Sequence, residues 1–192
     1  DGHNAADMRA AEMARTLAFV TTERTRIANL KCKDVVAIGR APYTNWIGKM
    51  QEADKEIVMR SLASVGMEAY AERTMDKMSD GECQRIMIAR ALAQDTSIIL
   101  LDEPTAFLDF PSKVALMQLL QHLAHHEQKT IILSTHDVEL ALQFADHLWL
   151  LGTEGIVQGA PATLAADGSI ARFFQTEGLQ FDAATLRFTV SV

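Results

Sequence analysis

The sequence has little cysteine, no excess of basic charge and no long apolar run. Only two of its 192 residues are cysteines, and the formal net charge is −7. Cys32 and Cys83 lack metal-ligand spacing, so we expect buried or partly buried free thiols in a reducing cytoplasm. The acidic balance argues against binding of nucleic acid, because phosphate contacts need clustered Lys and Arg. The longest apolar runs, such as 98–101 and 148–151, are far shorter than the ~20 residues that span a bilayer, so any membrane role must be peripheral.

With 48% hydrophobic and 22% charged residues, the chain is globular and long enough to bury a substantial core. Its most informative stretch is the apolar run 98–101, which ends in Asp102, Glu103 and Pro104. A continuous run of Ile and Leu predicts an interior strand of a parallel sheet, covered on both faces. Two acids at its end indicate a ligand site, because ligands bind at the carboxyl ends of strands in open α/β sheets. Simple turn chemistry is the alternative.

A magnesium–phosphate ligand fits this pair of acids. Asp102 would hold Mg²⁺ through its waters, and Glu103 would position and polarise an attacking water. Three further segments accompany the pair: 78–85 (MSDGECQR), 106–109 (AFLD) and 134–137 (STHD). In this order and at these separations, the set resembles the ATP-binding-cassette (ABC) ATPases, as their signature motif, Walker B strand, D-loop and switch histidine.

The resemblance covers nearly the whole chain and implies its fold class. We expect an α/β protein with a P-loop NTPase-type (RecA-like) parallel sheet core and an inserted α-helical subdomain. The core would comprise 1–22 and 83–192, and the helical subdomain 23–82, ending in the signature motif. Strands are predicted at 16–20 and 130–134, and a helix at 52–65.

The resemblance also assigns the catalytic roles. It implies that Glu103 acts on water, that the neutral imidazole of His136 bonds to the γ-phosphate, and that Asp102 holds Mg²⁺ through water. Asp109, in the D-loop, is expected to contact a second subunit. A lone histidine in the place of His136 is otherwise more often structural.

The signature segment, 78–85, is open to two interpretations, one functional and one structural. The resemblance implies that Ser79, Asp80, Gly81 and Glu82 act on nucleotide bound to a second subunit, with the serine and the glycine facing the γ-phosphate. Met78, Asp80 and Glu82 depart from the usual Leu-Ser-Gly-Gly-Gln. The spacing of Ser79 and Glu82 is that of a capping box, which would turn the extra carboxylate away from phosphate. A helix that begins there would point its positive end at an anion. A purely structural cap is the alternative.

The family's Q-loop position is occupied by Thr22. That loop usually supplies a glutamine that senses Mg²⁺ and the γ-phosphate, so the substitution changes the expected chemistry. A threonine hydroxyl can still reach a magnesium-bound water, and neighbouring Glu23 is a second candidate. The alternative is a plain polar turn.

No G-x-x-x-x-G-K-[ST] phosphate loop occurs in the sequence. We therefore expect an incomplete core: a fragment of a longer ATPase that lacks the Walker A portion, binds ATP very weakly and is inactive by itself. Without that portion, the strand at 98–101 would lose part of its cover and apolar surface would be exposed. A non-catalytic interaction module with this fold is the alternative.

Residues 39–43 (GRAPY) are similar to the matching stretch of importers for iron-siderophore, haem and cobalamin, although a helix stop at Gly39 before a proline turn explains them equally well. The resemblance thus implies an ATPase that uses ATP and Mg²⁺, forms a homodimer with a second copy and powers an integral-membrane permease. It would lie peripherally at the cytoplasmic face of the inner (plasma) membrane. A soluble ABC ATPase of translation or DNA repair is the alternative. The DNA-repair relatives carry a long coiled coil between the Q-loop and the signature motif, whereas residues 24–78 contain no heptad repeat.

Overall fold

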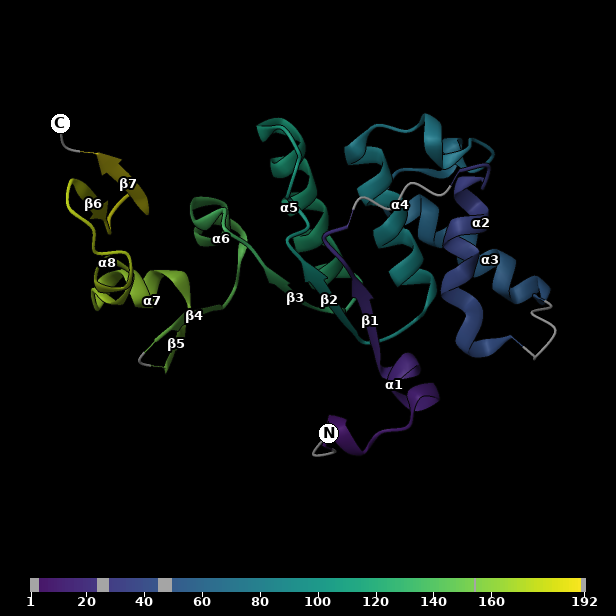
Figure 1. Cartoon of the computed structure of the whole chain (residues 1–192), viewed down its shortest axis with the longest axis horizontal. Coiled ribbons are helices and arrows are strands. Elements are labelled where there is room, and N and C mark those ends of the chain that lie inside the picture. The colour runs from purple at the N-terminus through teal and green to yellow at the C-terminus, as the bar shows by residue number, and fades with distance from the viewer. Residues whose placement is uncertain (1–3, 24–27, 45–49, 154, 191–192) are drawn as a thin grey trace. The chain divides into compact units, whose positions relative to one another are not determined.

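The computed structural model describes residues 4–23, 28–44, 50–153 and 155–190 (Figure 1). The chain forms two compact units, Asp1–Ser134 and Thr135–Val192. The predicted helical stretch between the Q-loop and signature positions begins at Ile27, which lies outside the described residues, as do 45–49.

The first unit combines a small sheet with most of the helices. Its elements are 3-10 turns at Ala5–Asp7, Glu68–Tyr70 and Met75–Lys77, a 3-10 helix at Ile38–Tyr43, helices α1 (Ala10–Thr16), α2 (Cys32–Ala37), α3 (Glu52–Ser64), α4 (Asp80–Ala93) and α5 (Phe110–His126), and strands β1 (Leu17–Val20), β2 (Ile98–Asp102) and β3 (Thr130–Ser134). The strands predicted at 16–20 and 130–134 and the helix predicted at 52–65 are thereby confirmed to within a residue.

The three strands form a parallel sheet in the order β1-β2-β3 (Figure 1). Val20 pairs with Leu101, and Asp102 pairs with Ser134. All three strands therefore end at the same edge of the sheet, and residues that follow them gather there. This parallel sheet, with helical connections between its strands, confirms the predicted α/β class.

Burial alternates along the central strand β2. Ile99 and Leu101 are buried, whereas Ile98 and Leu100 are only partly buried. On neighbouring β1, Phe19 is 50% exposed. Because successive side chains point to opposite faces, one face of the sheet packs against helices and the other stays partly open. Full cover on both faces, predicted from the apolar run, is therefore wrong: Ile98 and Leu100 are only partly covered.

The segment at Ile38–Tyr43 is a 3-10 helix that continues directly from α2, not a helix stop followed by a turn. Gly39 is required there by a close approach between backbones. A Cβ at this position would lie 2.2 Å from the carbonyl oxygen of Arg90 on α4. The glycine thus lets the 3-10 helix pack directly on α4.

Arg40 ties this 3-10 helix to two other helices. Its guanidinium donates to the carboxylate of Asp54 on α3 at 2.9 Å and to the carbonyl oxygen of Ala93, at the end of α4, at 2.9 Å. The ring of Tyr43 stacks 4.0 Å from the guanidinium carbon. Arg40 and Asp54 are both buried, so each compensates the charge of the other.

Cys32 and Cys83 are both buried free thiols, as predicted. Burial raises the pKa of the Cys32 thiol, which keeps it protonated and unreactive. In the described residues, no helix combines the length and the apolar character needed to cross a bilayer.

The second unit contains two short hairpins and three helices. Its elements are α6 (Val138–Phe144), β4 (Leu148–Gly152), β5 (Gly155–Gly159), α7 (Pro161–Ala166), α8 (Ser169–Phe173), β6 (Leu179–Asp182) and β7 (Arg187–Val190). Strands β4 and β5 pair antiparallel, as do β6 and β7. Its core consists of Leu142, Leu150, Leu164, Ala165 and Ile170, with Phe174, Phe181 and Phe188 packed against them.

Candidate functional site

The start of α4 is a reciprocal capping box, as its sequence predicts. The Ser79 Oγ accepts a hydrogen bond from the N–H of Glu82 at 3.3 Å. In return, the Glu82 carboxylate accepts from the N–H of Ser79 at 2.8 Å and from its Oγ at 2.9 Å. The bond from the Ser79 N–H, above all, lowers the pKa of Glu82, so the cap is ionised at neutral pH. This carboxylate is engaged by its own helix start.

The signature segment packs against the segment that follows β2. A Cβ on Gly81 would meet the Ser112 Oγ at 3.7 Å and the Leu108 side chain at 4.0 Å, which is ordinary contact. Asp109, at the predicted D-loop, caps α5 by accepting a hydrogen bond from the N–H of Ser112 at 3.1 Å. The bonds from Ser112 lower the pKa of Asp109. The signature and D-loop segments therefore lie together in the first unit.

At the carboxyl end of β2, two hydroxyl groups hold the side chain of Asp102. The Thr22 Oγ1 donates to one carboxylate oxygen at 2.6 Å, and the Ser134 Oγ donates to the other at 2.7 Å. These bonds, with that from Thr22 the larger cause, lower the pKa of Asp102. Thr22, at the Q-loop position, therefore reaches Asp102 directly.

Glu103 follows with an unusual backbone conformation. Its φ angle is 46°, in the left-handed region that non-glycine residues seldom adopt. Its N–H donates to the Ser134 Oγ at 3.0 Å. Backbone strain of this kind gathers at functional sites, where surrounding contacts hold it in place.

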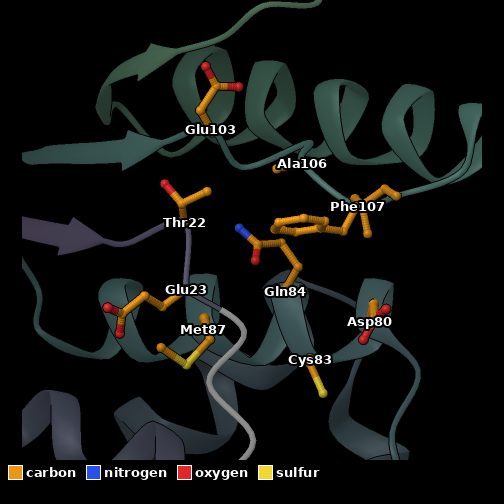
Figure 2. A pocket seen from close by; sticks show the side chains of 10 residues that line it. Thr22, Glu23, Asp80, Cys83, Gln84, Met87, Glu103, Ala106 and Phe107 are labelled. Atoms are coloured by element: carbon orange, nitrogen blue, oxygen red, sulfur yellow. The ribbon is translucent and has the colours of Figure 1, made fainter.

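A small cleft lies between the turn after β1, the first turns of α4 and the segment after β2. Figure 2 shows Thr22, Gln84 and Phe107 among its lining side chains, with the carboxylate of Glu103 turned away from Thr22. Asp80, from the signature segment, also lines it. The cleft has a volume of about 30 Å³, which is room for about one or two water molecules. A space of this volume is too small to enclose a nucleotide.

His136, the predicted switch histidine, belongs to the second unit. It is exposed, and its carbonyl oxygen accepts a hydrogen bond from the N–H of Val138 at 3.0 Å, at the start of α6. The neighbouring Thr135 Oγ1 accepts from the N–H of Asp137 at 3.0 Å. These bonds shape the turn that carries the imidazole.

The end of β2 offers donors that suit Mg²⁺. Asp102 is exposed, and each of its carboxylate oxygens has one hydroxyl donor, so lone pairs stay open toward solvent. Within the described ranges, no group of three or more His, Cys, Asp or Glu side chains is arranged as a metal cage. Mg²⁺ usually keeps several waters and binds through one or two carboxylates together with substrate phosphates. Asp102 fits that manner of binding.

Ser134 is a residue of this site that the sequence alone does not identify. In sequence it is only part of the segment around His136, yet it bonds to both Asp102 and Glu103. A signal was present, because Ser134 ends a strand predicted to lie parallel to β2. Polar residues at the ends of parallel neighbours meet at one edge.

Sequence comparisons place the chain among ATP-binding proteins of transporters. The profile of the family described as ABC transporter matches residues 1–106. An uncharacterized ABC transporter ATP-binding protein of Methanocaldococcus jannaschii is 43% identical over 157 residues, which are 82% of this chain and 54% of that protein. The petrobactin import ATP-binding protein FpuD of Bacillus anthracis is 36% identical over 171 residues, covering 88% and 63%. The chain thus spans about half to three fifths of these relatives.

Solved structures agree with this assignment. An ABC transporter in an inward-facing conformation matches with a TM-score of 0.76 and 25% identity, over 91% of this chain and 70% of the other. A dimeric ATP-binding cassette in a post-hydrolysis state, bound to ADP and Pi, matches with a TM-score of 0.67 and 26% identity, over 84% and 71%. Together with the family match, these findings show that the chain belongs to the ABC transporter family and shares the α/β fold of its ATP-binding cassettes.

Proposed function

We propose that the chain is part of the ATP-hydrolysing subunit of an ABC importer, of the class that takes up iron-siderophore, haem or cobalamin. The observation that carries the proposal is the end of β2, where Asp102 and Glu103 are held at the sheet edge by hydrogen bonds. The relative from Bacillus anthracis is named for petrobactin import, which supports the importer class. The family match supports the ATPase.

In this proposal, the two adjacent acids divide the chemistry between them. Mg²⁺, held through water by Asp102, would neutralise charge on the phosphates of ATP. Glu103 orients a water molecule and accepts its proton as the water oxygen bonds to the γ-phosphorus and the bond to ADP breaks. His136 donates a hydrogen bond to the γ-phosphate.

The proposed active unit is a homodimer. Ser79 and Gly81 of one copy would complete the nucleotide site of the other, with Asp80 beside them and Asp109 at the contact between copies. The engagement of Glu82 by the Ser79 N–H supports this, because it holds that carboxylate at its own helix start. Dimerisation of a related cassette bound to ADP and Pi is further support.

The proposed partner is an integral-membrane permease, driven by closure of the dimer at the cytoplasmic face of the inner membrane. The phosphate-binding loop would be supplied by sequence beyond these 192 residues, since the relatives extend well past the matched region. We retain 1–22 and 83–192 as the ATPase core and 23–82 as the helical subdomain. The buried pair of Arg40 and Asp54, both within 23–82, supports this division.

The proposal is tested by Glu103→Gln in the full-length protein. The amide keeps the size of the side chain but cannot accept the proton, so turnover should fall roughly 10²–10⁴-fold while ATP still binds. Malachite-green phosphate release measures turnover, and fluorescence of a trinitrophenyl-ATP analogue measures binding. Glu127→Gln, which removes an exposed carboxylate at the C-terminal end of α5, is the matched control and should retain most activity. Near-normal turnover of Glu103→Gln would reject Glu103 as the catalytic carboxylate.

A further inference from the structure

We propose that Thr22 and Ser134 form a hydroxyl clamp that positions both acids at the end of β2: the side chain of Asp102 and the backbone of Glu103. The inference rests on the proposed ATPase function and names two positioning residues for it. Neither hydroxyl is assigned to the reacting atoms. Each acts through a neighbouring acid.

The first half of the clamp fixes the orientation of the Asp102 carboxylate. Thr22 donates to one oxygen at 2.6 Å and Ser134 to the other at 2.7 Å. Short bonds to an ionised acceptor are among the stronger hydrogen bonds in proteins. The two donors lie on opposite sides of β2, because Thr22 follows β1 and Ser134 ends β3. Rotation of the carboxylate would therefore break at least one of the two hydrogen bonds. The remaining lone pairs are thereby aimed in a fixed direction.

The second half of the clamp fixes the chain at Glu103. The Ser134 hydroxyl donates its proton to Asp102 and accepts the N–H of Glu103 at 3.0 Å. A hydroxyl can serve both roles at once. The accepted bond supports a φ angle of 46° at Glu103, which is costly without such a contact. One serine therefore couples the placement of the two acids.

The register of the three strands brings the residues of the clamp together. Asp102 is paired with Ser134 across β2 and β3, and Thr22 lies just past the end of β1. The Thr22 Oγ1 also lies 3.0 Å from the carbonyl oxygen of Asp102, but its single proton goes to the nearer carboxylate oxygen. In the described part of the chain, these are the hydroxyls that bond the Asp102 carboxylate.

Steady-state kinetics of the full-length protein test the clamp. Ser134→Ala should lower kcat about 10–100-fold through misplacement of Glu103, with KM for ATP within about twofold of the parent. Ser134→Thr restores the hydroxyl and should recover most of kcat. Thr22→Val should raise the Mg²⁺ concentration needed for half-maximal activity, and Thr22→Ser should restore it. Ser97→Ala, at the opposite end of β2, is the matched control and should behave like the parent.

A second measurement reads the clamp without any activity. In ¹⁵N-labelled protein, the N–H of Glu103 should exchange with deuterium about tenfold faster in Ser134→Ala, because its acceptor is lost, whereas Ser134→Thr and Ser97→Ala should exchange like the parent. Unchanged exchange of this N–H in Ser134→Ala would overturn the inference, as would unchanged kcat in that variant. If the parent hydrolyses no ATP, the proposed function fails, and the exchange of the Glu103 N–H still decides on the clamp.

Discussion

Two acidic turns in the first unit are held in different ways. At the start of α4, Glu82 accepts from the backbone N–H and the hydroxyl of Ser79, three positions away, with a smaller contribution from the Tyr70 hydroxyl. At the end of β2, Asp102 receives one hydroxyl from 80 residues upstream and another from 32 residues downstream. The first turn can form with its own helix, whereas the second requires three strands in register.

The difference indicates which part of the site depends on the rest of the fold. A capping box costs little entropy because its partners are already close along the chain. The clamp around Asp102 forms only when the sheet has closed, so any shift in strand pairing would separate its members. We therefore expect the signature turn to survive changes elsewhere that disrupt the acids at the end of β2.

The largest expected effect comes from separating the two roles of Ser79, which are the helix cap and the proposed contact with the γ-phosphate across the dimer. Ser79→Asp is made together with Glu82→Gln, so that two carboxylates do not meet in the capping box, and it keeps a good helix cap but places a negative charge where phosphate is expected. Like charges brought together at an interface cost several kcal/mol, so ATPase activity of the full-length protein should fall at least about 10³-fold while the melting temperature stays near that of Glu82→Gln alone. Phosphate-release assays and calorimetry measure the two effects.

Ser79→Ala is the paired variant. It loses the cap, at about 0.5–2 kcal/mol of stability, but adds no repulsion, so it should melt lower and keep more activity than the aspartate variant. If Ser79→Asp retains full activity, Ser79 is only a cap, and the proposed action across the dimer must be withdrawn.

The carboxylate of Asp54 makes both a local contact and a contact with a distant segment of the chain. It accepts from the N–H of Gln51, three residues away, and from Arg40 at a distance along the chain. Arg40→Met would leave the buried carboxylate without its cation, which should lower the free energy of unfolding by about 3 kcal/mol in urea titrations. Lys55→Met, which removes an exposed pair with Glu52, is the control and should change little. Equal midpoints for the two variants would contradict a structural role for the buried pair.

The smallest expected effect is the pH dependence of the α4 cap. The folded-state pKa of Glu82 lies below its ordinary value of about 4.3, so its contribution is fully present above that pH and is lost as the pH falls through the folded pKa. Melting temperatures between pH 3 and 6 should therefore fall less steeply in Glu82→Gln than in the parent. Parallel curves would show that the Glu82 cap adds no measurable stability.

Reasoning from sequence was most successful where contacts are local. The capping box at Ser79 and Glu82 was predicted from spacing alone, because both partners lie within one helical turn. The strand ending at Asp102 was predicted from its apolar run. The acids at its end could be identified because they stand directly after that run.

What the sequence did not reveal depends on pairing between distant segments. Neither the bond from Ser134 to the Glu103 backbone nor that from Thr22 to Asp102 follows from spacing. The partial exposure of the sheet face that carries Leu100 could not be predicted either, because a continuous apolar run does not show whether both faces of a strand are covered. Gly39 was interpreted as a helix stop, because a glycine in the sequence is equally consistent with a turn and with a close contact such as that with the Arg90 carbonyl.

The measurement that tests the central claim most directly is sedimentation velocity of full-length Glu103→Gln with and without Mg²⁺ and ATP. The account predicts a monomer without nucleotide and a dimer with ATP, because hydrolysis can no longer open the closed state. Adding Ser79→Asp with Glu82→Gln to this variant should prevent the dimer. A protein that sediments identically with and without ATP, or a dimer that tolerates the aspartate, would contradict a site built from the acids of one copy and the signature turn of another.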